Sequence, residues 1–246
     1  MGLFDKLKKN KSKDELPPIS EKDMKRIYDL IEEIKQQDCE FYESLKKLNL
    51  YVFPLESNTN LLSKSEVAHT MISSLHCCIK TKKILNLMSE DFLLSETYKK
   101  LMLKFTDGFI FDELEKVDDY SDEELINMSK SNYSAYFYAY ILGLIDKIPG
   151  TPEDCDEKAL CSLITNFDSY GKMLDNCKML DKESMLYIAD SLCLETIYYM
   201  YKKHNNMPYD EKNKEYKSIQ RSCSFYILSY DFDAIMKKIN NLNPKV

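Results

Sequence analysis

Apolar residues recur at three- and four-residue intervals along nearly the whole chain from Ser20 onward. The first stripe consists of Met24, Ile27, Ile31 and Ile34, and similar stripes follow as far as residue 240. This spacing aligns apolar side chains on one face of an α-helix. The chain has only five glycines and few alternating runs of Val, Ile and Thr, so it offers little material for strands. We therefore predict an all-α protein with a single compact, bundle-like domain of about eight to ten helices, spanning residues 20–246.

Capping signals mark where several of these helices begin. Ser63 with Glu66 and Ser121 with Glu124 form capping boxes, in which side chain and backbone bond reciprocally, and Asp181 gives a weaker signal. The patterns predict one long helix, or two with a kink, over 20–49 and a connector at 50–53. Long helices follow from 63 and from 121, the second ending at the breaker 149–152. Further helices are predicted from 181 to about 204, from 211 to 230, and from 231 or 233 to about 240.

Residues 1–19 differ from the rest and are predicted to form a flexible basic arm. Leu3, Phe4 and Leu7 fall on one helical face, lysines stand at positions 6, 8, 9, 11 and 13, and two prolines end the segment. Lysines near an anionic membrane surface contribute about 1 kcal/mol each, which supports transient contact rather than anchoring. A membrane-surface adaptor acting through this arm is one alternative function, with weak membrane contact at most.

The composition narrows the class of partner and the compartment. The net charge of −7 disfavours nucleic acid, whose phosphates are neutralised by Lys and Arg, and favours basic partners. No apolar run approaches the roughly 20 residues needed to cross a bilayer. The eight cysteines follow no secretory leader and mostly lie in apolar helical stretches, which indicates reduced thiols in the core. We expect a soluble, cytoplasmic protein.

Motifs for the common cofactors and metals are missing from the sequence. Five scattered glycines cannot build a loop that cradles phosphates. His69 and His76 are seven residues apart, about 10.5 Å along a helix, which is too far to bind one metal. We therefore predict no cofactor and no metal, and any catalytic site would have to be assembled across helices.

Two groups of polar residues are candidate sites. The first is an acidic run that either docks a basic partner or forms a solvated loop and helix start: Asp112, Glu113, Glu115, Asp118, Asp119, Asp122, Glu123 and Glu124. The second is a polar site between helices, made by Asp190 and Glu195 with Arg221. Carboxylates among apolar residues are candidates for raised pKa values. A five-residue spacing places Asp190 and Glu195 about 140° apart around a helix, so each needs a partner from elsewhere.

An aromatic-rich helix at 131–146 ends in Leu-Gly-Leu-Ile-Asp and is followed by Pro149 and an acidic turn. In this pattern the chain resembles the bacterial family of unknown function numbered 4272. Residues 188–192, 220–226 and 231–233 also look similar to elements of that family, so the resemblance covers residues 50–240. It implies an intracellular helical fold and no established activity. The chain departs from the family in lacking Trp and in having Leu194 or Glu195 where the family has Arg.

Two classes of function fit these features. The preferred hypothesis is a non-catalytic protein-binding module, such as an immunity or antitoxin-like inhibitor, because the chain is acidic, lacks catalytic motifs and is rich in tyrosine. Its 18 tyrosines include clusters whose members cannot all face the core, and exposed tyrosine is good contact material. The alternative is an enzyme whose carboxylate site lies between helices. The partner and the oligomeric state stay open at this point.

Overall fold

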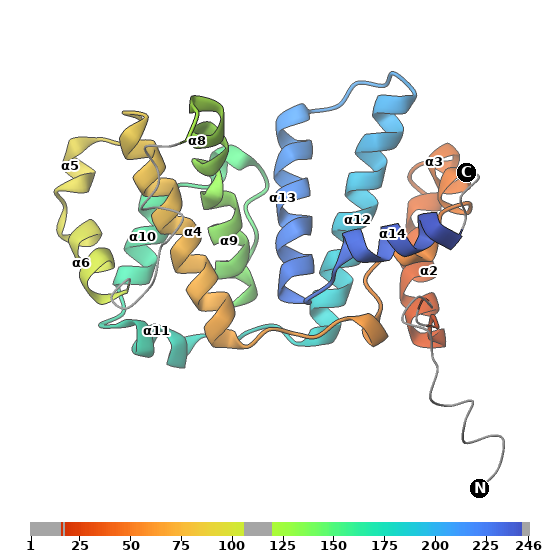
Figure 1. Cartoon of the computed structure of the whole chain (residues 1–246), viewed down its shortest axis with the longest axis horizontal. Helices are drawn as coiled ribbons and strands as arrows, with labels where there is room; N and C mark the ends of the chain where they lie inside the picture. Colours follow the sequence, from red (N-terminus) through yellow and green to blue (C-terminus); the bar gives the residue numbers. More distant parts are fainter. Residues whose placement is uncertain (1–15, 17, 106–119, 243–246) are drawn as a thin grey trace, which may run out of the picture.

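The computed structural model describes residue 16 and residues 18–105 and 120–242, and every regular element in these residues is a helix (Figure 1). This confirms the predicted fold class. Twelve α-helices lie in the described residues, one of them, α5, being a single turn. They are α2 (Glu21–Lys35), α3 (Cys39–Leu45), α4 (Lys64–Ile84), α5 (Glu90–Leu93), α6 (Glu96–Lys104), α8 (Asp122–Met128), α9 (Ser131–Ile141), α10 (Glu157–Thr165), α11 (Tyr170–Asn176), α12 (Lys182–His204), α13 (Glu211–Ile227) and α14 (Phe232–Leu242).

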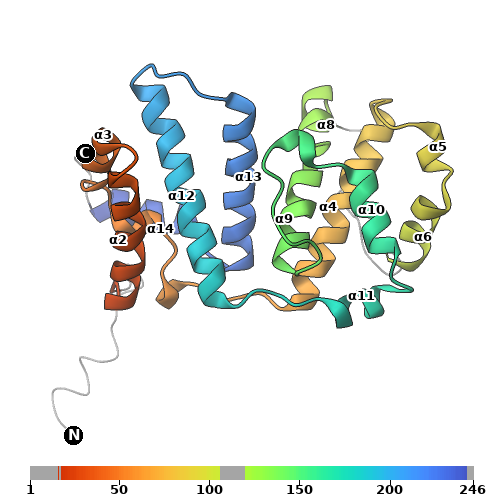
Figure 2. The ribbon, with the colours of Figure 1, turned by 180° about the vertical axis from the view of Figure 1, so that it is seen from behind.

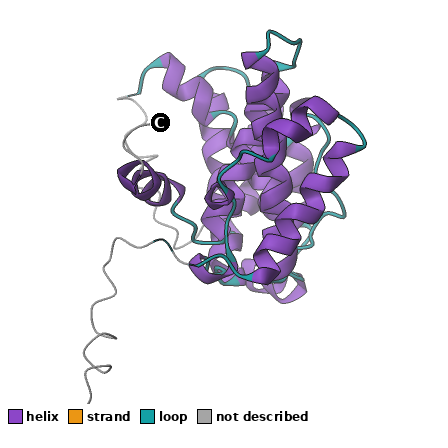
Figure 3. Ribbon diagram, turned by 90° about the vertical axis from the view of Figure 1, so that its right-hand side faces the viewer, coloured by secondary structure: helices purple, strands orange, loops and turns teal. Residues whose placement is uncertain are grey.

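The longer helices stand side by side in a row. From one end the order is α2, α12, α13, α9, α4, α10 and α6, and each helix contacts the next (Figures 1 and 2). Seen from one end of this row, the described residues are helices joined by loops, with no strand among them (Figure 3). Because α2 stands at the end of the row, α12 covers only one of its sides.

One hydrophobic core runs through the whole row. Fully buried side chains come from its first helix, its centre and its far half, for example Ile27, Phe137 and Leu75. Burial of each such side chain contributes about 1.5–3 kcal/mol to the stability of the fold. The apolar stripes in the sequence therefore explain why the helices pack together. Six of the eight cysteines are buried, as expected for core residues.

The predicted helix starts are confirmed where the structure describes them. Both capping boxes are present, with Ser63 capping α4 and Ser121 capping α8, and the Asp181 carboxylate accepts the Ser184 amide at 2.8 Å. The segment predicted as one long helix or two is two, because Asp38 caps a new helix, α3. The apolar connector at 50–53 contains a single 3-10 turn, η1 (Leu50–Val52). Of the predicted arm at 1–19, residues 1–15 and 17 lie outside the described residues.

The predicted long helix from Ser121 is wrong, because the structure has two shorter helices there. The Ser129 hydroxyl donates to the Ile126 carbonyl at 2.7 Å and the Ser131 hydroxyl to the Met128 carbonyl at 2.6 Å, which competes with the helical ladder between α8 and α9. The second helix also ends well before the prolines. Gly143 takes a φ of +69°, and the Leu144 amide donates to the Ala139 carbonyl at 2.9 Å, which closes α9 in a Schellman turn.

No helix in the described part of the chain is long and apolar enough to span a membrane.

Candidate functional site

The contact between α2 and α12 is organised by one arginine. Arg26 of α2 donates from Nε to Asp190 Oδ2 of α12 at 2.6 Å, and from Nη1 to Asp23 Oδ1 at 2.6 Å. Its Nη2 donates to the Pro54 carbonyl at 2.8 Å. The guanidinium thus joins two helices and the connector between α3 and α4. We call Asp23, Arg26 and Asp190 the polar joint.

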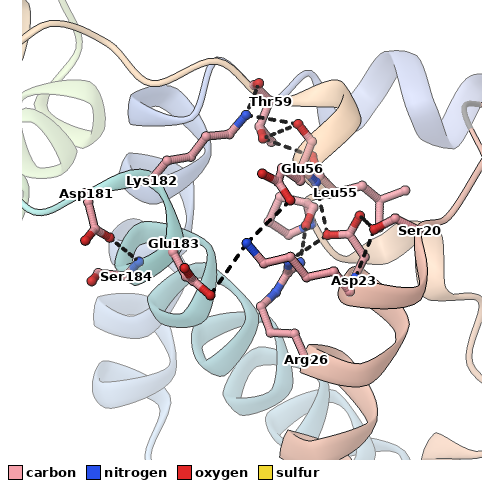
Figure 4. Close-up of polar contacts among 12 residues, drawn as sticks. Ser20, Asp23, Arg26, Leu55, Glu56, Thr59, Asp181, Lys182, Glu183 and Ser184 are labelled. Carbon is pink, nitrogen blue, oxygen red and sulfur yellow. Dashed lines mark hydrogen bonds and ion pairs between the residues drawn. The ribbon is translucent and has the colours of Figure 1, made fainter.

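The polar joint is buried and supported by the backbone around it. The side chains of Asp23 and Asp190 have no exposed surface, and that of Arg26 keeps 11%. Ser20, the N-cap of α2, donates its hydroxyl to Asp23 at 2.7 Å, and the Glu56 amide donates to the same carboxylate at 3.1 Å (Figure 4). Asp23 therefore has its position fixed by the first turn of α2 as well as by Arg26.

Lysines at the edge of the joint hold the connector against both helices. Lys182, in the first turn of α12, donates to the carbonyls of Glu56 at 2.9 Å and Thr59 at 2.7 Å (Figure 4). Lys22 of α2 lies 3.7 Å from the Glu56 carboxylate and 3.6 Å from that of Glu183. The ion pairs of Lys22 are exposed, whereas the side chains of Asp23 and Asp190 have no exposed surface.

The two carboxylates of the joint titrate differently. Burial raises the pKa of Asp190 to about 7, against the attraction of Arg26, and its Oδ1 has no hydrogen-bond partner among the described residues. Burial also raises the pKa of Asp23, but hydrogen bonds from Ser20, the Glu56 amide and Arg26 outweigh it and hold that pKa below its usual value. Asp190 is therefore the group in the joint that can exchange a proton near neutral pH.

Sequence reasoning missed Arg26, although the sequence contains a signal for it. Only two of the 34 basic residues in the chain are arginines, Arg26 and Arg221; all others are lysines. Both occupy positions that need a planar guanidinium: Arg26 makes forked bonds in the interior, and Arg221 lies over the rings of Phe225 and Phe232, 5.8 Å from each centroid. In this lysine-rich chain, the two arginines are thus an inward and a stacked cation.

The structure gives each of the three predicted inter-helix residues a different partner. Asp190 pairs with Arg26, whereas Glu195 pairs with Lys217 of α13 at 3.0 Å, and Arg221 stacks on aromatic rings. Asp190 and Arg221 both lie close enough to Cys193 to shift its pKa, in opposite directions, but burial dominates and raises the pKa of this thiol. A nucleophilic cysteine needs a lowered pKa, so Cys193 is a protonated core residue at neutral pH.

The predicted acidic run is only partly described. Asp112, Glu113, Glu115, Asp118 and Asp119 lie outside the described residues. Asp122, Glu123 and Glu124 are exposed in the first turn of α8. The Glu124 carboxylate accepts the Ser121 hydroxyl at 2.7 Å, which lowers its pKa, and so part of this acidity serves to begin a helix.

A groove lies between α2 and α12 beside the polar joint. Its volume is about 300 Å³. It is lined by the C-terminal half of α2, the start of α3 and the middle of α12, through Leu30, Glu33, Ile34, Gln37, Asp38, Phe41, Tyr187, Ser191, Leu194, Glu195 and Tyr198. We call these residues the α2–α12 groove.

The groove combines an apolar floor with an acidic rim. Phe41 is buried at its base, with its ring centroid 4.8 Å from that of Tyr198, while Tyr187 remains 50% exposed at the edge. Glu33, Asp38 and Glu195 supply carboxylates, and none of the described residues lining the groove is basic. Glu195 is partly neutralised by Lys217, whereas Glu33 faces solvent. Such a surface suits an apolar side chain that is flanked by positive charge.

The described residues bear on the predictions for metal binding and for the histidines. No group of three or more His, Cys, Asp or Glu side chains there is arranged to hold a metal ion. His76 lies buried in α4, and burial together with the charge of Lys80 lowers its pKa to about 4, which keeps the imidazole neutral at physiological pH.

Comparison with known proteins returned no match of any of three kinds: no protein-family model, no curated protein and no solved structure is similar to this chain. The resemblance to the family numbered 4272 stays a prediction from the sequence.

Proposed function

We propose that this chain is a protein-binding module that captures a basic amphipathic helix of a partner protein in the α2–α12 groove. The proposal rests on one observation: apolar and aromatic side chains form the floor of a groove whose only charged lining residues, among those described, are acidic. An inhibitor of the immunity or antitoxin kind is one form that such a module takes. Its role would be to cover a surface of the partner.

The shape of the groove supports a helix as the bound element. Helix-in-groove recognition places side chains at i, i+3 or i+4, and i+7 into an apolar channel between helices. The groove lies between two helices, and its apolar residues Leu30, Ile34, Phe41 and Leu194 come from α2, α3 and α12. A cavity of about 300 Å³ is at the lower limit of ordinary binding sites, so it accommodates a few side chains rather than a large ligand.

The charge of the groove supports a basic partner. Glu33 and Asp38 stand on one side of the floor and Glu195 on the other. Complementary charge accelerates encounter and fixes orientation, while affinity comes mainly from desolvated aromatic anchors. Tyr187, which is half exposed, is the groove residue suited to that second role.

A synthetic peptide tests the proposal. The probe is an amphipathic helix with Leu at i, i+3, i+4 and i+7 and Lys elsewhere, labelled with a fluorophore and titrated with the full chain. We expect saturable binding that the variant Glu33→Lys/Tyr187→Ala weakens about tenfold or more, because it removes an exposed aromatic contact and reverses one rim charge. Fluorescence anisotropy measures both affinities.

A matched pair of substitutions serves as the control. Tyr28 is 50% exposed, as Tyr187 is, and lies on α2 nearly opposite the residues that line the groove. Glu123 is an exposed acid on α8, at a distance from the groove (Figure 1). The variant Tyr28→Ala/Glu123→Lys should bind the probe as the wild type does. The proposal would be contradicted if both double variants weakened binding equally. It would also be contradicted if a peptide with Glu in place of Lys bound the wild type as tightly as the probe does.

A further inference from the structure

We infer that a segment of this same chain, residues 1–13, occupies the α2–α12 groove and competes there with the partner protein. The inference deepens the proposed function and rests on it, because it names an internal ligand for the same groove. The segment has the chemistry that the groove selects: Leu3, Phe4 and Leu7 share one helical face, and five lysines, at positions 6, 8, 9, 11 and 13, surround it. Asp5 is the only acid among residues 1–13.

The attachment point of the segment lies within reach of the groove. Leu16 and Ile19 pack against the core at the start of α2, and the groove begins at Leu30. With a rise of 1.5 Å per residue, Leu30 lies about 15 Å along α2 from Ser20. Residues 10–15 alone span up to about 20 Å when extended. Leu7 and Phe4 therefore reach the groove if the chain turns back along α2.

Connection to α2 makes even a weak contact effective. A short flexible linker gives an effective concentration of the order of 1 mM. If the isolated segment binds with a dissociation constant of about 0.1 mM, the tethered segment fills the groove most of the time and weakens partner binding about tenfold. A partner must then displace the segment, so the groove responds only to a stronger ligand than its own first residues.

The absence of tryptophan makes a direct test available. The chain contains no Trp, so Phe4→Trp in the full chain introduces a single emitting indole. We expect a blue-shifted emission relative to a free peptide of residues 1–15 carrying the same substitution, because the indole lies on the apolar floor. Adding excess Leu and Lys probe peptide should shift the emission back toward that of the free peptide.

Groove and control variants locate the contact. Combining Phe4→Trp with Glu33→Lys/Tyr187→Ala should return the emission to that of the free peptide. The same indole combined with Asp122→Lys/Glu123→Lys should stay blue-shifted, since these exposed acids lie on α8, at the other half of the molecule (Figure 1). Release by the α8 variant alone would place the segment on the acidic run and overturn the inference. A blue shift seen only with vesicles of anionic lipid would overturn it in favour of membrane contact.

Probe affinity separates failure of the inference from failure of the proposed function. The full-chain variant Phe4→Ser/Leu7→Ser should bind the probe about tenfold more tightly than the wild type. Equal affinity, together with an emission like that of the free peptide, overturns the inference and leaves the proposed function standing. Binding of the probe to neither protein overturns the proposed function, and the indole emission then still decides whether the segment lies in the groove.

Discussion

The helices α2 and α12 meet in two unlike ways along one line of contact. Near the start of α2 and in the middle of α12 they are joined through buried charge, where Arg26 links Asp23 and Asp190 with almost no exposed surface. Beside this joint, toward the C-terminal end of α2, the same two helices leave a groove with an exposed tyrosine and a solvent-facing acid. The first region is closed and polar inside; the second is open, apolar at its floor and charged only at its rim.

The difference separates a structural contact from a binding surface. Breaking a buried ion pair by removing one partner is costly, because the remaining charge has no water to solvate it. The polar joint therefore holds α2 at a fixed position on α12. With α2 fixed, the groove keeps its shape, and its exposed side chains Glu33 and Tyr187 stay available to another molecule.

The largest effect is expected from removing the arginine of the joint. Arg26→Leu leaves two carboxylates in the interior and should lower the free energy of unfolding by about 3–5 kcal/mol at neutral pH. The loss should be smaller at acidic pH, where protonation neutralises the carboxylates. Urea denaturation at both pH values measures it. Lys217→Leu, which removes the partly exposed partner of Glu195, is the matched control; an equal loss in both variants would erase the distinction.

The next effect is a pH dependence due to Asp190. The pKa of Asp190 is about 7 in the folded protein, against 3.8 for an ordinary aspartate, which stands for the unfolded chain. At any pH between these two values, the folded state therefore keeps a proton that the unfolded chain has released. The free energy of unfolding therefore falls as pH rises through this window, by up to about 1.4 kcal/mol per pH unit. Asp23 does not share the window, because its pKa is lowered.

Asp190→Asn should remove this slope, since an amide does not titrate. The measurement is the difference in unfolding free energy between wild type and variant in urea, at about pH 5, 6, 7 and 8. The difference should change across the range and level off above about pH 7. Parallel curves would show that Asp190 stays ionised throughout and that Arg26 outweighs its burial.

A smaller effect is expected at the ion pair beside the groove. Glu195 and Lys217 are 43% and 22% exposed, so their pair contributes about 0–1 kcal/mol. Glu195→Gln should therefore change stability by no more than this amount, and high salt should reduce the change further. Thermal denaturation at low and high salt checks it. A loss as large as that of Arg26→Leu would mean that the groove, too, is part of the structural contact.

The smallest effect on stability is expected at the groove tyrosine. Tyr187→Ala should leave the unfolding free energy within about 0.5 kcal/mol of the wild type, because half of the side chain is exposed. The same variant should still weaken binding of the Leu and Lys peptide. Tyr28→Ala should change neither quantity. If Tyr187→Ala instead lowered stability and left peptide binding unchanged, Tyr187 would be a structural residue and not part of a binding surface.

Local signals in the sequence were sufficient for most helices. The spacing of apolar residues and the serine and aspartate caps predict α4 and α12 with their starts, because both depend on residues within a turn or two of each other. The same rules failed at Ser129 and Gly143. There the apolar stripe continues, while a serine hydroxyl or a left-handed glycine ends the hydrogen-bond ladder.

The sequence by itself determined that Asp190 lies on a mostly apolar helix and needs a partner from elsewhere; only the tertiary structure decided that the partner is Arg26, 164 residues away. Helical periodicity fixes which face a side chain occupies, but not which distant helix meets that face. The same holds for the groove, whose residues come from α2, α3 and α12. Its acidic rim and apolar floor adjoin each other because burial of the core and the Arg26 contact place α2 against α12.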